Sequence, residues 1–180
     1  VINATGPWTD RTRAMAHAAP PLLRPTKGVH IVVSAERMNM KHAVVCTHPV
    51  DERVLFAIPW GEQTYVGTTD TDHDGDPATV RATGEDVDYL IGCMNHYFPS
   101  VELCRDDVIA TWAGLRPLIH EDGSTSTVSR EHEIVVDPDG LITVAGGKLT
   151  TYRKMGAEVV SEALNLMALL GEVPHGVHDA

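Results

Sequence analysis

The sequence lacks the features of a secreted, membrane-spanning or nucleic-acid-binding protein. No stretch approaches the roughly 20 consecutive apolar residues that a transmembrane helix needs, and no charged start followed by an apolar segment marks a signal peptide. The chain of 180 residues has 14 lysines and arginines against 25 aspartates and glutamates, which gives a formal net charge of -11. Because this charge repels phosphates at long range, we expect no nucleic-acid partner, and any anion must be bound by a local site.

Cysteine is also scarce. Cys46, Cys93 and Cys104 form no CxxC pair, and one of them is left over in any disulfide scheme. This pattern favours a reducing, cytosolic environment, and we expect buried free thiols. The chain opens on "VINATG", a strand-like run without an initiator methionine, so we interpret it as an internal fragment of a longer protein.

Motifs of metal and nucleotide sites are incomplete. The segment "DTDHDGD", residues 70–76, begins like a calcium-binding EF-hand loop, but Arg81 stands where that loop needs a bidentate glutamate. We interpret the segment as a solvated acidic loop. No HxxxH or HExxH pattern occurs in a helical setting, so no metal is expected. GxSxG, P-loop and strand-linked GxGxxG motifs are absent too, so the sequence indicates neither a hydrolase nor a complete nucleotide-binding unit.

The order of hydrophobic patterns predicts a mixed fold. A short first strand and a weak helix from Pro7 to Ala19 precede a series of short β-branched segments, which predict antiparallel hairpins at 28–34, 42–47, 53–60 and 63–69. Thr83 and Asp86 form a capping-box pattern at the start of an amphipathic helix that ends at Pro99. Strand character returns at 107–119, 126–136 and in "LITVAGG", and a last helix begins near Thr150.

Three basic residues in the second half are candidates for binding an anion. Arg116 precedes Pro117, which holds it in an extended conformation, while Arg130 lies within a predicted strand and Lys148 ends the "AGGK" loop. If the three cations converge, they suit a small phosphorylated substrate, because guanidinium binds two phosphate oxygens at once. The alternative is that each forms an ordinary salt bridge with one of the many carboxylates.

The stretch "AGGKLTTYRK", residues 145–154, combines a flexible backbone with a helix start. A helix beginning at Thr150 exposes unpaired N–H groups and a partial positive charge, and Gly146 and Gly147 allow another molecule to approach the backbone. Such an end stabilises an anion, of which a reduced flavin is one example. The alternative is a plain helix cap supplied by Thr150 or Thr151.

Several motifs occur along the chain in this order: "NATGPW", "RPTKGVHIVV", "FAIPWGEQTYVGTTD", "AGLRPL", "SREHEI" and "GGKLTTYRKM". Together they resemble the FAD-dependent glycerol-3-phosphate dehydrogenases over nearly the whole chain up to about residue 165. The GxGxxG segment that would grip the FAD pyrophosphate is missing.

The resemblance implies an α+β fold, in which an antiparallel sheet with packed helices forms a substrate-binding cap. Fragments of an FAD-binding α/β domain of the D-amino-acid-oxidase type complete the chain. The expected parts are FAD-domain segments at 1–26 and 137–172, the cap at 27–136 and a tail at 173–180.

The resemblance also implies an activity, the oxidation of sn-glycerol 3-phosphate to dihydroxyacetone phosphate by hydride transfer from C2 to N5 of FAD. Arg116 and His30 would be catalytic, and Arg116, Arg130 and Lys148 would hold the substrate. The residues that would contact FAD are Thr5, Gly6, Gly146, Gly147, Lys148, Leu149 and Thr150.

Electrons would pass to quinone, which implies a cytoplasmic protein in peripheral contact with the inner face of the cell membrane; a homodimer is compatible with the resemblance. The isolated fragment is expected to be inactive. Two alternatives stay open, namely another flavoprotein of the D-amino-acid-oxidase type and a non-catalytic binding or assembly module.

Overall fold

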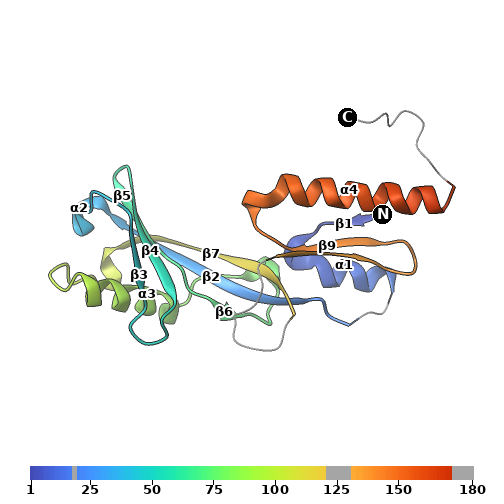
Figure 1. The fold of residues 1–180 in the computed structure, drawn as a ribbon. Helices are drawn as coiled ribbons and strands as arrows, with labels where there is room; N and C mark the ends of the chain where they lie inside the picture. Colours follow the sequence, from blue (N-terminus) through green and yellow to red (C-terminus); the bar gives the residue numbers. More distant parts are fainter. Residues whose placement is uncertain (18–19, 121–130, 172–180) are drawn as a thin grey trace. The chain divides into compact units, whose positions relative to one another are not determined.

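The structure is a computed structural model that describes residues 1–17, 20–120 and 131–171. It divides into two compact units, and the divisions fall within two long strands (Figure 1). Unit 1 contains Val1–Pro25 and the described residues from Pro117 onward, whereas unit 2 contains Thr26–Arg116. Each unit is described by itself.

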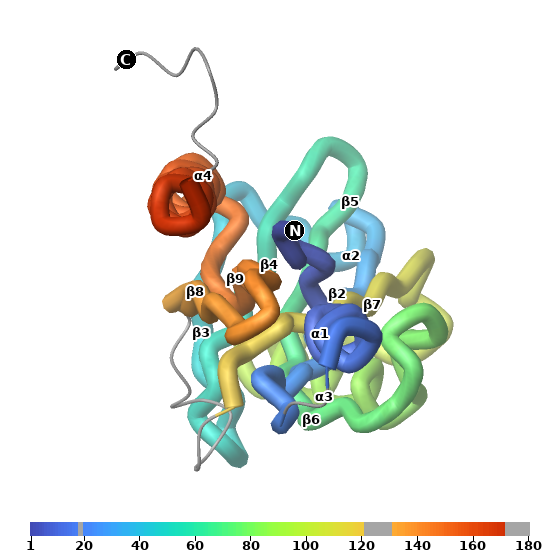
Figure 2. Tube along the Cα trace, turned by 90° about the vertical axis from the view of Figure 1, so that its right-hand side faces the viewer, coloured from blue at the N-terminus to red at the C-terminus, as the bar shows by residue number. Residues whose placement is uncertain are grey.

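Unit 1 is a small sheet between two helices. The sheet has the order β1 (Ile2–Asn3), β9 (Ile142–Gly146), β8 (His132–Val136), with β1 parallel and β8 antiparallel to β9. Helices α1 (Thr9–Ala16) and α4 (Tyr152–Leu169) lie on opposite sides of β9 in both the ribbon and the tube view (Figures 1 and 2). Because β9 is covered on both faces, most of its residues are buried apolar or threonine side chains.

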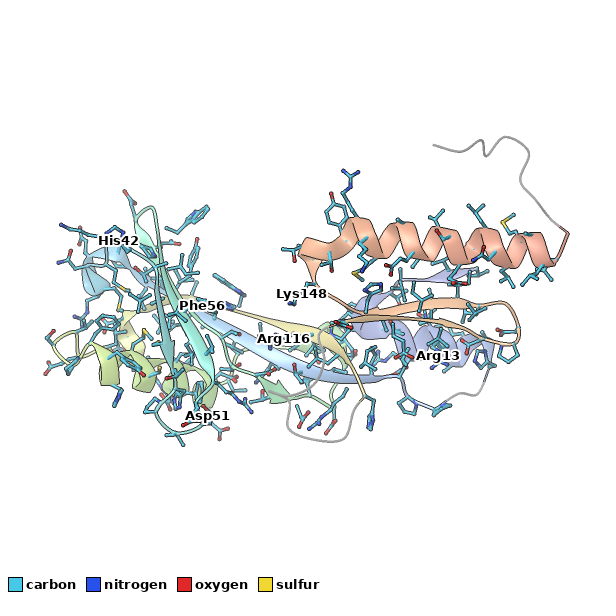
Figure 3. The ribbon with its side chains drawn as sticks, viewed as in Figure 1. Arg13, His42, Asp51, Phe56, Arg116 and Lys148 are labelled. Carbon is cyan, nitrogen blue, oxygen red and sulfur yellow. The ribbon has the colours of Figure 1, made fainter. Side chains whose placement is uncertain are left out.

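A buried ion pair holds α1 to the turn after β8. The Arg13 guanidinium donates to both carboxylate oxygens of Asp137, from Nη2 to Oδ1 at 3.0 Å and from Nε to Oδ2 at 3.3 Å. This hydrogen bonding raises the pKa of Arg13 despite the opposing effect of burial. Figure 3 shows Arg13 reaching from α1 within unit 1. A bidentate arginine–carboxylate pair also restricts the orientation of the helix.

Unit 2 is built on an antiparallel sheet. Its strand order is β3-β4-β5-β2-β6, and β7 also pairs with β2. The strands are β2 (Leu23–Ser34), β3 (Val44–Thr47), β4 (Val54–Trp60), β5 (Gln63–Gly67), β6 (Thr71–Asp72) and β7 (Val108–Ile119).

Helix α3 (Gly84–Tyr97) covers one face of this sheet. Its fully buried Leu90 and Met94 join a cluster with Val29, Ile31, Val33, Leu55, Ala57 and Val66 from the strands. The alternation along β4 is regular, so that Leu55 and Ala57 face the helix while Phe56 is exposed on the other face (Figure 3). The predicted capping box is confirmed, since Asp86 N donates to Thr83 Oγ1 and Thr83 N donates to Asp86 Oδ2.

An acid-dependent stability is expected from Asp86, which also binds Lys27 Nζ at 2.6 Å. Burial opposes ionisation of Asp86, but hydrogen bonds from Lys27 and Thr83 outweigh it and lower the pKa below the ordinary value. A carboxyl with a depressed folded-state pKa stabilises the protein above its unfolded pKa of about 4, and this stabilisation is lost as the pH falls through the folded pKa.

The free energy of unfolding, measured by urea denaturation, is therefore expected to fall below about pH 5. The Asp86→Asn variant should show a smaller decrease over this range, whereas Asp74→Asn, at an exposed position, should keep the wild-type dependence. Identical pH profiles for wild type and Asp86→Asn would contradict the assignment.

Three local expectations are corrected by the structure. Strand β2 begins at Leu23 rather than at residue 28 and includes Pro25. The chain can extend there because the Asp10 carboxylate accepts hydrogen bonds from Leu22 N and Leu23 N, at 2.9 and 3.0 Å, so these N–H groups need no ladder partner. Helix α2 (Ala35–Met38), with Ser34 as its N-cap, and β6 were not predicted.

The third correction concerns the cysteines. Cys46 and Cys93 are buried in the core of unit 2 with their Sγ atoms 3.9 Å apart, and burial raises the pKa of the Cys93 thiol to about 12. Cys104 is exposed, contrary to expectation. It is the N-cap residue of the short 3-10 helix Arg105–Asp107, and its N–H donates to Asp107. Cys104 therefore belongs to a surface turn and not to the core.

The domain bounds expected from the sequence stay predictions. Strand β8 pairs with β9 and belongs to unit 1. Its residues fall within the segment 27–136 that was expected to form the cap. In residues 1–17, 20–120 and 131–171, the structure has no helix with the length and apolarity required to cross a bilayer.

Candidate functional site

In unit 1, two of the predicted FAD-contacting segments lie at the same edge of the sheet. Thr5 and Gly6 follow β1, and Gly146 to Lys148 end and follow β9. Because β1 and β9 are parallel neighbours, with Asn3 paired to Thr143, their carboxyl ends meet at one edge. In open sheets with parallel strands, that edge is where cofactors bind.

The backbone after β9 requires glycine at two consecutive positions. Gly146 has a φ of +71° and Gly147 one of +79°, in the left-handed region that side chains disfavour. A Cβ at Gly146 would lie 2.5 Å from the carbonyl oxygen of Glu131, and one at Gly147 would lie 2.6 Å from Sδ of Met155. Only glycine therefore fits at these two positions, which lie where β9 ends.

The helix start that follows is not capped by a side chain in the described part of the chain. A 3-10 turn, η4 (Leu149–Thr151), precedes α4, so the α-helix begins at Tyr152 rather than near Thr150. The Thr151 hydroxyl does not cap the helix; it donates to the carbonyl oxygen of Lys148 at 2.9 Å. The alternative of a plain threonine cap is thus wrong, and the helix end keeps its partial positive charge for another partner.

A pocket of about 290 Å³ adjoins this turn. Its lining residues are Glu131, His132, Gly147, Lys148, Thr151 and Lys154. His132 packs under Gly147, and its Nε2 lies 2.5 Å from Oε2 of Glu158 on α4. That hydrogen bond is the main cause of the lowered pKa of Glu158. The sequence analysis missed His132 because its partners are brought together only when β8 and α4 pack.

Asn3 is a second residue that the sequence analysis missed. It is almost fully buried, and its Oδ1 accepts hydrogen bonds from both the N–H and the hydroxyl of Thr5, at 3.3 and 2.7 Å. Its Nδ2 donates to the carbonyl oxygen of Thr9 at 3.1 Å. Asn3 thereby fixes the turn that leads to Gly6, whose φ is +58°. The sequence signal that could have identified Asn3 is its place in the motif "NATG".

In unit 2, Arg116 is held at a defined position near the end of β7 (Figure 3). Its Nη1 donates to Oδ1 of Asp70 at 3.0 Å and to the carbonyl oxygen of Thr69 at 3.2 Å. Its Nη2 donates to Oγ1 of Thr68 at 3.0 Å. Asp70 is buried and ion-paired, so the interpretation of its segment as a solvated acidic loop is wrong for this residue.

His30 lies in the same unit, on the sheet face opposite α3. Its ring stacks on Trp112 with centroids 5.0 Å apart and packs on Gly67, its neighbour across the β2–β5 ladder. Burial, and then the charge of Arg116, lower the pKa of His30. Nδ1 is buried and has no hydrogen-bond partner among the described residues. The lowered pKa favours the neutral form of the His30 imidazole, which lies within the field of Arg116.

The structure thus gathers the candidates into two groups. Unit 1 contains Thr5, Gly6, Gly146, Gly147 and Lys148, followed by the exposed Leu149 and Thr150, whereas unit 2 contains His30 and Arg116. Arg130 lies outside the described residues. The convergence of Arg116, Arg130 and Lys148 stays a prediction. Within the described part of the chain, no group of three or more His, Cys, Asp or Glu side chains could hold a metal ion.

Comparison with known proteins is consistent with this arrangement. The model of the DAO family, described as FAD dependent oxidoreductase, matches residues 1–153. The chain belongs to this family.

Two relatives of this FAD-dependent oxidoreductase chain are named aerobic glycerol-3-phosphate dehydrogenase. The protein from Staphylococcus epidermidis is 47% identical over 162 residues, and that from Staphylococcus aureus strain USA300 is 46% identical over 162 residues. Each match covers 89% of this chain and 29% of the relative. The chain therefore spans less than a third of the length of these curated relatives.

Solved structures confirm the predicted fold class. The glycerol-3-phosphate dehydrogenase from Bacillus halodurans, complexed with FAD, matches with a TM-score of 0.83 and 44% identity, over 93% of this chain and 32% of that one. The FAD-bound L-alpha-glycerophosphate oxidase from Mycoplasma pneumoniae matches with a TM-score of 0.62 over 93% of this chain and 42% of that one; at 22% identity, it supports the fold alone. The chain thus has the α+β architecture of the D-amino-acid-oxidase type.

Proposed function

We propose that the chain is part of a flavoprotein that oxidises sn-glycerol 3-phosphate to dihydroxyacetone phosphate. The main support is the 46–47% identity to proteins of that name over 89% of the chain. A second support is the presence, in unit 2, of a fixed guanidinium beside a neutral histidine, which suits a phosphorylated alcohol. FAD would supply the acceptor for the hydride that leaves C2 of the substrate.

The residues of unit 1 fit FAD. Gly146 and Gly147 have positive φ and no room for a Cβ against Glu131 and Met155, so the turn that would lie at FAD depends on glycine. The uncapped turn at η4 offers N–H groups to an electron-rich acceptor. Thr5 and Gly6 would bind from the neighbouring strand end. The positive end of α4 would favour negative charge on the reduced cofactor.

The residues of unit 2 and the two other cations would act on the substrate. Arg116, Arg130 and Lys148 would bind it, chiefly through its phosphate. His30, neutral because burial and Arg116 lower its pKa, can accept the proton of the substrate hydroxyl as C2 is oxidised. Trp112 and Gly67 would keep the imidazole in place.

The test is anaerobic addition of substrate to the FAD-loaded, full-length protein. Loss of the yellow flavin absorbance with sn-glycerol 3-phosphate, but not with D-amino acids, is the expected result. Reduction by amino acids alone would favour another flavoprotein of this type. If Arg130→Ala left dye reduction by glycerol 3-phosphate unchanged, the contribution of Arg130 would be contradicted. If the wild-type protein were itself inactive, a non-catalytic module would be favoured.

The electron acceptor and location are part of the same proposal. We propose that electrons pass to quinone, and that the full-length protein is cytoplasmic, binds peripherally to the inner face of the cell membrane and forms a homodimer. A soluble quinone should then reoxidise the flavin, and the protein should sediment with phospholipid vesicles. Light scattering of the purified protein measures its oligomeric state.

The isolated 180 residues are expected neither to retain FAD nor to turn over. The chain contains no GxGxxG segment after a strand, and such a segment supplies the helix start that binds the pyrophosphate. Gel filtration of the purified chain after mixing with FAD should separate a colourless protein from the yellow cofactor. Stoichiometric flavin in the protein peak would refute this expectation.

Substitution of Gly147 by alanine is expected to weaken FAD binding by the full-length protein about tenfold or more. The backbone there is left-handed, and the new Cβ would lie 2.6 Å from Sδ of Met155 and 3.0 Å from Cβ of His132, so the turn must shift. Gly156→Ala is the matched control, because nothing lies within 4 Å of a Cβ there. Equal flavin content in the two variants would contradict the role of Gly147.

A further inference from the structure

The end of β5 and the three residues that follow it touch both candidate catalytic side chains of unit 2. Gly67 lies against the ring of His30, and the next three residues supply the acceptors of Arg116. The segment itself is tied to β2, because Thr69 Oγ1 accepts from Val29 N at 3.0 Å. Thr69 and Asp70 are both buried. A rigid piece of backbone therefore sets the positions of two groups that belong to other strands.

The contacts of Arg116 define the plane of its guanidinium. Its acceptors include Oδ1 of Asp70 and the carbonyl oxygen of Thr69 at Nη1, and Oγ1 of Thr68 at Nη2. Because guanidinium is planar, hydrogen bonds at two of its nitrogens fix the orientation of its plane. The backbone of Gly28 also packs against the guanidinium, since a Cβ at Gly28 would lie 2.5 Å from Nη2 of Arg116.

Asp70 is the one charged member of this set of acceptors. Its side chain is 10% exposed, against 25% for that of Arg116, so water screens the pair less than a surface pair. A carboxylate at this depth has a high desolvation cost and is stable only with a partner such as this guanidinium. Replacing the carboxylate by an amide keeps the shape of the side chain but removes the charge that holds the guanidinium.

We propose that Asp70, assisted by Thr68, is a positioning residue that holds Arg116 in the orientation in which it binds substrate. This inference rests on the proposed function, because it assigns Asp70 a role in substrate oxidation through Arg116. It goes beyond the sequence motifs, in which Asp70 ends "FAIPWGEQTYVGTTD" and begins the segment that resembles a calcium loop, without a role of its own. Asp70 itself touches neither substrate nor cofactor in this scheme.

The test is a double-mutant cycle in the FAD-loaded, full-length protein, with kcat and KM for sn-glycerol 3-phosphate as readouts. Asp70→Asn should lower kcat/KM about 30-fold in the wild-type background, as expected for the loss of one charge-assisted hydrogen bond to a buried group. In the Arg116→Ala background, the same change should alter kcat/KM by less than about threefold, because Asp70 then has nothing to position. Asp70→Glu should recover part of the activity.

Controls separate positioning from folding. Asp74→Asn makes the same chemical change at an exposed position and should leave the kinetic constants unchanged. If Asp70→Asn does not fold, Thr68→Val removes one acceptor while keeping the shape, and it should lower kcat/KM several-fold in the wild-type background only.

Two results would overturn the inference while leaving the proposed function intact. These are wild-type kinetic constants for both Asp70→Asn and Thr68→Val, and equal losses in both Arg116 backgrounds. A wild-type protein that is loaded with FAD but is not reduced by sn-glycerol 3-phosphate would instead overturn the proposed function, and this inference with it.

Discussion

Replacing Arg116 by alanine is expected to lower kcat/KM for sn-glycerol 3-phosphate by about a thousandfold in the FAD-loaded, full-length protein. A guanidinium that binds phosphate makes charge-assisted hydrogen bonds worth about 1.5–3 kcal/mol each, and two of them correspond to about three powers of ten. The substitution also leaves Asp70 buried without its ion pair. Steady-state dye reduction at several substrate concentrations measures the effect.

Arg105→Ala is the matched control for this prediction. Arg105 pairs with Asp88 at 2.5 Å in the same unit, but the two side chains are 61% and 56% exposed. An exposed pair contributes little to stability, so this variant should keep its activity. Flavin content should be equal in both variants. A fall of less than about tenfold for Arg116→Ala, at full flavin loading, would contradict the assigned role.

Replacing Leu90 by alanine is expected to lower the free energy of unfolding by about 3 kcal/mol. Leu90 is fully buried where α3 packs on the sheet of unit 2, and a leucine-to-alanine change in a core costs about 2–5 kcal/mol through lost apolar burial and the cavity left behind. For a chain of this size, the melting temperature should fall by about 6–12 °C. Thermal unfolding followed by circular dichroism measures it.

Leu169→Ala makes the same chemical change at the end of α4, where the side chain is 85% exposed. Its melting temperature should stay within about 2 °C of that of the wild type, because surface substitutions usually change stability by less than about 0.5 kcal/mol. If the two variants melted together, Leu90 would not lie in the core of unit 2.

The match between sequence and structure is best where a pattern repeats over a short stretch. The capping box at Thr83 and the helical spacing up to Tyr97 predicted α3 because both depend on residues three or four positions apart. The short β-branched segment at 53–60 predicted a strand, and β4 spans Val54–Trp60. The two glycines before Lys148 indicated an unusual backbone, and both have positive φ.

The expectations that needed correction depend on partners far away in the chain. The carboxylate of Asp10 allows β2 to begin early, and the buried state of Asp70 depends on Arg116, which is 46 residues away. Such pairs leave no period in the sequence, so no local pattern could have predicted them.

The amino-acid sequence by itself determined the α+β class, the resemblance to flavin-dependent dehydrogenases and the residues worth testing, because motifs and periodicities are properties of neighbouring residues. Only the tertiary structure decided that Asn3 holds Thr5, that His132 underlies Gly147, and that Thr68, Thr69 and Asp70 fix Arg116. The physical reason is that a buried polar group must find its partner wherever the packed backbone places one.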